Sequence, residues 1–500
     1  MLVAAVLGSS MVFLDGSTVN VALPALQASL GATVVDVQWV VNAYTLFLAS
    51  LLLLGGSLGD RLGRRRVFMA GVALFTAASI ACGVAPSTGW LIAGRALQGV
   101  GGALLTPGSL ALINAAYPVD ARGRAIGLWS GFSAITAAAG PVLGGWLIDT
   151  LSWRWIFFVN VPLAIGVLAI GALRVPESLG EGRRGRLDPA GALLATLGLG
   201  GVVFALLESS SRGLGDLGVW AAGAGGAACL AGFVLVERRV ATPMLPPSLF
   251  RSRTFAGVNV LTLLIYATLS GLLFFLPMSL IQVHGYSATQ AGAATLPFVL
   301  LLFGLSRWSG GLRDRVGARL PLVAGALLVA AAFALFALLG VTGRYWTGVF
   351  PAVMVLGMGM ALVVAPLTTT VMAAAPDALA GTASGVNNAV SRVAGLLAIG
   401  VFGVVMVAVF SARLETGLGA LPLSEVQRAQ VWADRTDLGA LAPPESLSEE
   451  ARRQLVALVD EAFLAGFRVV MWAMAGLGVA GAWVAWATVP QRAVPDEDEG

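Results

Sequence analysis

The sequence predicts an all-α polytopic membrane protein in which two six-helix bundles flank two inserted transmembrane helices. Three observations carry this prediction. Only 11% of the 500 residues are charged and 58% are hydrophobic, apolar runs of membrane-spanning length recur along the chain, and one polar loop sequence occurs twice. Soluble proteins carry about 25% charged residues, so the composition indicates a chain that lies in a lipid bilayer.

Fourteen apolar runs have the length that a helix needs to cross a hydrocarbon core roughly 30 Å thick. A span in lipid can satisfy its backbone hydrogen bonds only as a helix, so each run predicts a transmembrane helix. The first run lacks a basic region and is too long for a signal peptide, so we expect it to be retained. The predicted spans are 2–26, 37–58, 67–86, 90–115, 124–148, 155–173, 189–207, 217–236, 256–281, 290–309, 320–341, 347–374, 382–411 and 466–488.

The distribution of arginine predicts the orientation of these spans. All 30 basic residues are Arg, and an even number of spans places both termini on one side. If that side is cytoplasmic, its short loops and tail hold eighteen Arg, against three in the short loops of the other side. The positive-inside rule therefore predicts a multi-pass protein of the cell (inner) membrane with both termini cytoplasmic. The net charge of +4 follows from this topology and does not indicate nucleic-acid binding.

An internal repeat divides the chain into halves. Residues 56–65 read GSLGDRLGRR and residues 310–319 read GGLRDRVGAR, an offset of 254. A second match, at an offset of 258, pairs Gly99 with Gly357 among other positions. Parallel repeats of this kind are typical of transporters whose two bundles rock about a central site. The predicted domains are a bundle at 1–174, a linker with two inserted helices at 175–253, a bundle at 254–490 with an external loop at 412–465, and an acidic cytoplasmic tail at 491–500.

The repeated loop is a candidate cytoplasmic gate. Its glycines let helix ends approach closely, and Asp60 can accept hydrogen bonds from a helix N-terminus or from an Arg of the facing half. The alternative is that the Arg cluster only sets topology. In the second copy Arg313 replaces a glycine, which predicts a weaker latch. The candidate gate residues are Gly56, Gly59, Asp60, Arg61, Gly63, Arg64, Asp314 and Arg315.

Asp15 and Arg95 are the ionisable residues nearest the middle of their spans. Each would cost at least about 2.5 kcal/mol at the bilayer centre, so each is expected to face the bundle interior with a partner. Thr18 shares the helix face of Asp15, and Gln98 shares that of Arg95, so the two faces are candidates to meet. The pair could couple a proton to transport, or it could be a purely structural buried pair.

The fifth predicted span contains GPVLGG, with Gly140, Pro141, Gly144 and Gly145. Small residues at four-residue spacing permit close helix contact, and Pro141 removes one backbone donor and allows a bend. From the residues alone, this pattern indicates helix packing more often than a functional site.

Together these motifs resemble one known family. GSLGDRLGRRRVF resembles the signature loop of the major facilitator superfamily, and LIAGRALQGVGGAL resembles its fourth-span motif. LDGSTVNVALPAL, GPVLGG and WRWIFFVNVP are similar to the fourteen-helix branch of drug:proton antiporters. The resemblance implies that Asp15 and Arg95 take part in proton coupling, that Asp60 and Arg61 belong to the cytoplasmic gate, and that GPVLGG is the antiporter motif of exporters.

The resemblance also implies that the first and fourth helices of each half line a central cavity. The candidate cavity residues are Met11, Thr18, Gln98, Tyr266, Phe274, Met354 and Met358. The aromatic and Met residues among them could equally belong to a plain core or to a lipid-facing surface.

The expected function is proton-coupled efflux of small amphipathic drug-like compounds or antibiotics by alternating access. The alternative is a dedicated exporter of a single metabolite, lipid or siderophore. The only His, His284, has no Cys or acidic cluster beside it in the sequence and is expected in a solvated loop, so an enzyme or a metal site is not expected. The absence of Lys excludes a GxxxxGK[ST] nucleotide-binding loop. We therefore expect a monomer without a cofactor, with protons, a small-molecule substrate and the lipid bilayer as its partners.

Overall fold

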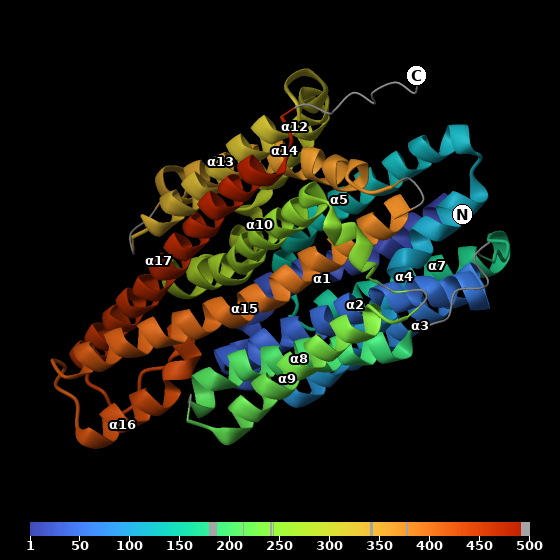
Figure 1. Cartoon of the computed structure of the whole chain (residues 1–500). Helices are drawn as coiled ribbons and strands as arrows, with labels where there is room; N and C mark the ends of the chain where they lie inside the picture. Colours follow the sequence, from blue (N-terminus) through green and yellow to red (C-terminus); the bar gives the residue numbers. More distant parts are fainter. Residues whose placement is uncertain are drawn as a thin grey trace. The chain divides into compact units, whose positions relative to one another are not determined.

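A computed structural model describes the chain except for residues 180–187, 214, 241–242, 244, 341–343, 377–378 and 492–500. Within helices, the side chains of residues 119–124, 130, 134, 306–307, 310–311, 313–315 and 380–381 also lie outside the description. The described part is helical, with no strand. Its α-helices (Figure 1) are α1 (Leu2–Leu30), α2 (Val34–Leu62), α3 (Arg64–Gly83), α4 (Thr88–Ala116), α5 (Val119–Thr150), α6 (Trp155–Phe158), α7 (Asn160–Arg174), α8 (Pro189–Arg212), α9 (Leu217–Glu237), α10 (Arg253–Met278), α11 (Ala288–Ala293), α12 (Leu296–Val316), α13 (Arg319–Ala337), α14 (Phe350–Ala373), α15 (Ala380–Leu418), α16 (Glu425–Ala433) and α17 (Glu449–Thr488).

The number of predicted spans is confirmed. Among the described residues, 14 helical segments are long and apolar enough to cross a membrane. The last two extend beyond their predicted limits, at Thr382–Leu418 and Glu449–Thr488. The predicted external loop 412–465 is therefore shorter than expected, because the residues from Glu449 onward form the first turns of α17. Between the two long helices lies α16, which begins with a capping box made by Ser424 and Gln427.

Contacts divide the chain into two compact units. Unit 1 consists of Met1–Met244, Phe274–Ala293 and Ile399–Phe463. Unit 2 consists of Leu245–Leu273, Ala294–Ala398 and Leu464–Gly500. The long helices α10, α15 and α17 contribute residues to both units. The predicted division at residues 174 and 253 stays a prediction.

The helices of unit 1 pack closely because small residues remove side-chain bulk where backbones meet. α4 packs against both α2 and α3. A Cβ atom on Gly101 of α4 would lie 2.6 Å from the backbone nitrogen of Phe75 on α3, so only glycine fits there. Phe75, Phe68 and Leu105 are fully or almost fully buried in the adjoining apolar core. Close backbone contact of this kind drives association in lipid, where apolar surface gains nothing from burial alone.

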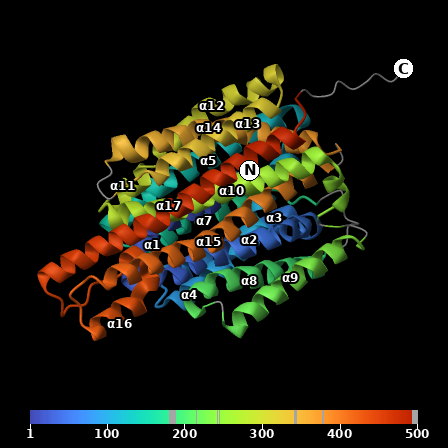
Figure 2. The ribbon, with the colours of Figure 1, turned by 60° about the vertical axis from the view of Figure 1, so that its left-hand side comes forward.

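The inserted helices α8 and α9 lie side by side in both views (Figures 1 and 2), and α8 also contacts α2. Each begins with an aspartate cap, since Asp188 accepts a hydrogen bond from the backbone of Gly191 at 2.7 Å and Asp216 accepts one from Val219 at 3.0 Å. Only 11% of the residues in the most apolar part of the α9 span are buried.

One glycine of the repeated loop has a positive φ in both halves. Gly63, between α2 and α3, has a φ of 111°, and Gly317, between α12 and α13, has a φ of 80°. The two glycines are related by the offset of 254 found in the sequence. Both conformations lie in the left-handed region that side chains disfavour, which explains why glycine occupies this position twice.

Candidate functional site

Asp15 of α1 and Arg95 of α4 form a buried ion pair inside unit 1. The two side chains are 0% and 1% exposed, and Arg95 Nη1 donates to Asp15 Oδ2 at 2.5 Å. Gln98, one turn along α4 from Arg95, accepts from Arg95 Nη1 at 2.8 Å and donates to Asp15 Oδ1 at 2.7 Å. The structure thus brings together three residues that the sequence placed on facing helix surfaces.

Two further polar residues complete this network, and neither was among the sequence candidates. Asn160, at the start of α7, donates to Ser79 Oγ at 3.0 Å and to Asp15 Oδ1 at 3.4 Å. Ser79 of α3 also accepts from Gln98 at 3.2 Å. Asn160 lies in the segment WRWIFFVNVP, so the motif was visible in the sequence, but its amide could not be assigned to Asp15 without the three-dimensional contact.

Aromatic rings and a backbone carbonyl hold the guanidinium of Arg95. Its central carbon lies 4.2 Å from the ring centroid of Tyr44 and 5.9 Å from that of Phe157. Its Nε donates to the carbonyl of Val40 at 3.1 Å. A cation held over rings and paired with a carboxylate is oriented as well as neutralised. The arginine therefore has one defined position next to Asp15.

Burial makes this network sensitive to the loss of either charge. Taking two ions out of water costs several kcal/mol for each ion, and the cost is recovered only when the ions pair and their remaining polar atoms are hydrogen-bonded. Asp15 meets this condition through three donors. Asn160 Oδ1 is buried and has no partner among the described residues, so an acceptor is available beside Asp15.

The GPVLGG segment lies on α5 between two other parts of unit 1. On one side a Cβ atom on Gly140 would collide with the side chain of Ser17, and one on Gly144 would lie 2.9 Å from Thr18 Cβ. On the other side a Cβ atom on Gly145 would collide with the carbonyl oxygen of Ala288. The packing that the sequence indicated is therefore present on two faces of α5, towards α1 and towards α11.

Pro141 belongs to the second of these faces. A Cβ atom on Gly292 of α11 would collide with the carbonyl oxygen of Pro141. Pro141 is internal to α5, and it removes a backbone donor from the helix at the same level.

The candidate gate residues of the first loop lie at the junction of α2 and α3. Asp60 Oδ1, on α2, accepts from Nε of Arg64, the first residue of α3, at 2.9 Å, and the two side chains are 46% and 21% exposed. Arg61 is in the last turn of α2, and Gly56 packs on Pro107 of α4. Gly59 packs near Arg64, and Gly63 makes the turn. The side chains of Asp314 and Arg315, in the second copy, lie outside the described residues.

An acid that the sequence did not single out occupies the start of α3. Glu177, in the segment after α7, accepts from the backbone N–H of Arg65 at 3.0 Å and of Arg66 at 3.3 Å. The backbone N–H of Arg64 donates to the carbonyl of Ser178 at 2.9 Å. The role expected of Asp60, a carboxylate on a helix N-terminus, is thus filled within unit 1 by Glu177.

The candidate cavity residues are divided between the two units. In unit 1, Met11 is fully buried in the apolar core, Phe274 is fully buried, and Thr18 donates to the backbone carbonyl of Asp15 at 3.2 Å. In unit 2, Tyr266 and Met354 are half-buried. Met358 is 37% exposed. Only Thr18 and Gln98 join the network at Asp15, and the cavity stays a prediction.

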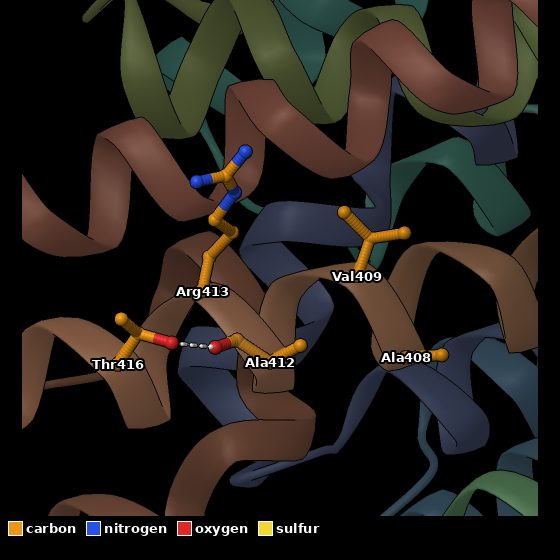
Figure 3. A pocket seen from close by; sticks show the side chains of 5 residues that line it. All are labelled: Ala408, Val409, Ala412, Arg413 and Thr416. Carbon is orange, nitrogen blue, oxygen red and sulfur yellow. Dashed lines mark hydrogen bonds between the residues drawn. The ribbon is translucent and has the colours of Figure 1, made fainter.

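A groove of about 400 Å³ lies on α15 and contains none of these candidates (Figure 3). Arg413 is exposed there and forms no ion pair with any residue that the structure describes. The residues that line it all belong to α15. They are Ala408, Val409, Ala412, Arg413 and Thr416.

The loop histidine was expected to be solvated, and it is instead half-buried in unit 1. His284 Nδ1 lies 2.9 Å from the carbonyl oxygen of Ser279. Cys82 and Cys229 are free. In the described part of the chain, no group of three or more His, Cys, Asp or Glu side chains could hold a metal ion.

The segment between α16 and α17 carries a half-buried acid outside the predicted spans. Asp437 lies in the 3-10 turn Asp434–Ala440, which contacts α1 and α2. Burial, together with the neighbouring carboxylates of Asp434 and Asp36, raises the pKa of Asp437 from 3.8 to about 6. The next residue, Leu438, is fully buried and has a φ of 54°, which is uncommon for a residue with a side chain.

Several proteins with similar sequences are named as resistance or export proteins. The chain is 36% identical over 482 residues to "Multidrug resistance protein Stp" of Mycobacterium tuberculosis, covering 94% of this chain and 88% of that protein. It is 33% identical to "Tetracenomycin C resistance and export protein" of Streptomyces glaucescens, covering 99% and 92%. It is 38% identical to "Cephamycin export protein CmcT" of Amycolatopsis lactamdurans, covering 80% and 83%.

Solved structures with the same fold are transporters. A bacterial homologue of the human lysosomal transporter Spinster, inward-facing and unoccupied, matches with a TM-score of 0.68 at 18% identity, covering 99% of this chain and 98% of that chain. The nucleoside transporter NupG matches with a TM-score of 0.61 at 12% identity, covering 97% and 99%. The family model of the Major Facilitator Superfamily matches residues 5–399. The chain therefore belongs to the Major Facilitator Superfamily and is a multi-pass membrane transporter rather than an enzyme.

Proposed function

We propose that the chain exports small amphipathic compounds, such as antibiotics or other drug-like molecules, in exchange for protons. The observation that carries the proposal is the carboxylate of Asp15, which is fully buried between Arg95, Gln98 and Asn160. A charge held at this cost inside a membrane protein marks a functional site more often than a structural one. The names of the relatives, which include multidrug resistance and export, support export as the direction of transport.

In this mechanism Asp15 takes a proton and its hold on Arg95 weakens, because the neutral carboxyl no longer pairs with the guanidinium. Asn160 Oδ1 and Gln98 Oε1 are the amide oxygens within the network that can accept the new O–H. Arg95 keeps its contacts with Tyr44 and the carbonyl of Val40. Release of the proton restores the pair, so the protonation of one group alternates two arrangements of α1 and α4. The proton gradient is the proposed energy source, without a bound cofactor.

We further propose that both termini are cytoplasmic, as the positive-inside bias predicts. The loop with Asp60 and Arg64 then faces the cytoplasm, and the end of α5 faces outwards. A cysteine placed in the tail after α17 would test this, since it would react with an impermeant maleimide only in inside-out vesicles.

The experiment that tests proton coupling uses the purified full chain in proteoliposomes with an imposed pH gradient. The substrate panel comprises puromycin, tetracenomycin C and a cephamycin, because relatives are named for resistance to or export of these compounds. We expect Asp15→Asn to abolish transport driven by the gradient, while Asp216→Asn, which alters a capping aspartate far along the chain from the network, keeps it. Gradient-driven transport by Asp15→Asn at the wild-type rate would refute the role of Asp15.

A dedicated exporter of one compound is the second candidate. It is favoured by the relatives that are named for a single compound, tetracenomycin C or a cephamycin. The same panel separates the two candidates. Transport of structurally unrelated compounds supports the multidrug function, whereas transport of one chemical class only supports the dedicated exporter.

A further inference from the structure

The GPVLGG face of α5 continues beyond its last glycine to a carboxylate that no sequence motif singled out. Asp149 follows Gly145 by one helical turn, so the two residues lie on the same face of α5. Its carboxylate accepts from the backbone N–H of Ala288 at 3.1 Å and from the backbone N–H of Thr289 at 2.8 Å. It also accepts from the hydroxyl of Thr289 at 2.5 Å. Three donors from one short segment converge on one acid.

The same face of α5 makes close backbone contacts with the same segment. A Cβ atom on Gly145 would collide with the carbonyl of Ala288, and one on Gly292 would collide with the carbonyl of Pro141. Pro141, Gly145 and Asp149 are spaced by four residues, so they form one stripe along α5. The stripe therefore combines steric fit in its buried part with charged hydrogen bonds at its exposed end.

The two parts of the stripe differ in how they can separate. The glycine contacts gain only dispersion energy, which is small for each atom pair and is spread over many atoms, so no single group controls it. Hydrogen bonds to an ionised carboxylate are stronger and directional. Asp149 is exposed, so its carboxylate returns to water when the contact breaks and leaves no buried charge behind. A contact of this kind can hold and still open reversibly.

We propose that Asp149 is a positioning residue that closes the antiporter-motif helix onto residues 288–292. This inference rests on the proposed export function and adds a residue to it. α5 also touches α1 through Gly144 and Thr18, next to the proton network. Holding α5 against residues 288–292 keeps the seam between α5 and α1 covered on the side of the membrane opposite to the Arg-rich loops. Release of Asp149 lets α5 move and opens that side.

The test measures how often residues 288–292 become accessible to water. Ala291 is fully buried in α11, so Ala291→Cys reports opening when the two native cysteines, Cys82 and Cys229, are replaced by Ala. The full chain in right-side-out vesicles is labelled with an impermeant maleimide. We expect Asp149→Asn to raise the labelling rate about five- to thirty-fold, the range set by losing a charge from two or three hydrogen bonds. Thr289→Val, which removes one of the three donors, should give a smaller rise.

Asp216→Asn is the matched control, because Asp216 is also an aspartate that accepts from a helix backbone, at the start of α9. Asp216→Asn should be labelled at the same rate as the Ala291→Cys chain in which Asp149 and Asp216 are unchanged. Equal labelling of Asp149→Asn and Asp216→Asn would overturn the proposal. Faster labelling of Asp149→Asn in a chain that transports none of the panel would uphold the contact while contradicting the proposed function. Transport of the panel by a chain in which Asp149→Asn leaves the labelling rate unchanged would uphold the proposed function while contradicting the contact.

Discussion

The ion pair of Asp15 and Arg95 leads to a quantitative prediction about stability. Arg95→Gln removes the donor to Asp15 and the contact with the carbonyl of Val40, and it leaves a fully buried carboxylate without its cation. Asp15→Asn conversely leaves a buried guanidinium without its anion. Removing one partner of a buried pair costs about 3–5 kcal/mol. We therefore expect each single variant to lower the free energy of unfolding by this amount.

The double variant should cost far less than the sum of the two singles, because it leaves no unpaired buried charge. Gln and Asn can still exchange amide hydrogen bonds with Gln98 and Asn160. We expect an interaction energy of about 3 kcal/mol, measured as a double-mutant cycle by denaturant unfolding in detergent micelles. The partly exposed pair of Asp60 and Arg64 is the control, for which about 0.2–1 kcal/mol is expected. Additivity at the buried pair to within about 0.5 kcal/mol would refute the reasoning.

Three further predictions concern other parts of unit 1. Gly145→Ala, which forces a Cβ atom onto a backbone carbonyl of α11, should lower the free energy of unfolding by about 1–3 kcal/mol, whereas Gly131→Ala, which meets nothing within 4 Å, should not; denaturant unfolding in micelles measures both. The raised pKa of Asp437 means that its ionised form is disfavoured in the packed segment. The neutral carboxyl of Asp437 therefore stabilises the folded segment fully below about pH 4, and this stabilisation is lost as the pH rises through about 6. After solvent screening the loss is about 1 kcal/mol, so proteolysis of residues 424–440 should speed up about five-fold from pH 4.5 to pH 7.5, but not in Asp437→Asn. Asn42 is fully buried and neither of its amide atoms has a partner among the described residues, so Asn42→Leu should be neutral or stabilising by about 1 kcal/mol in denaturant unfolding, and lost transport in this stable variant would indicate that the amide contacts substrate.

Much of the fold could be predicted because the membrane limits what an apolar run can do. The fourteen spans follow from length and hydrophobicity alone. The repeat follows from two matching loop sequences, and the equivalent glycines Gly63 and Gly317 both have a positive φ. The ends of the last two long helices could not be predicted in this way. Their extramembrane turns carry Arg and Glu that read as a loop, and tertiary contacts such as Gly417 against Leu458 keep them helical.

The charged part of the candidate site could be predicted from the sequence, because an ionisable residue inside a predicted span is costly in lipid and requires a partner. Asp15 and Arg95 could be paired from the sequence because each required a partner, and Gln98 followed from its place on the same face of α4. Asn160 and Ser79 are neutral residues that many spans contain, so nothing in the sequence distinguished them from residues that bond to their own helix. Their role depends on the meeting of α3 and α7, which is set by tertiary packing.

The GPVLGG segment of α5 packs against α1 within one helical turn of Asp15. Thr18 packs on Gly144 of α5 and donates to the backbone carbonyl of Asp15, so one side chain contacts both the GPVLGG segment and the helical turn that carries Asp15. In the proposed mechanism a change at Asp15 reaches α5 through this one residue. Coupling between sites needs an element with two arrangements that both sites bias. In the proposed mechanism α5 is that element, because Asp15 acts on it through Thr18 at one face and Asp149 holds it at the other.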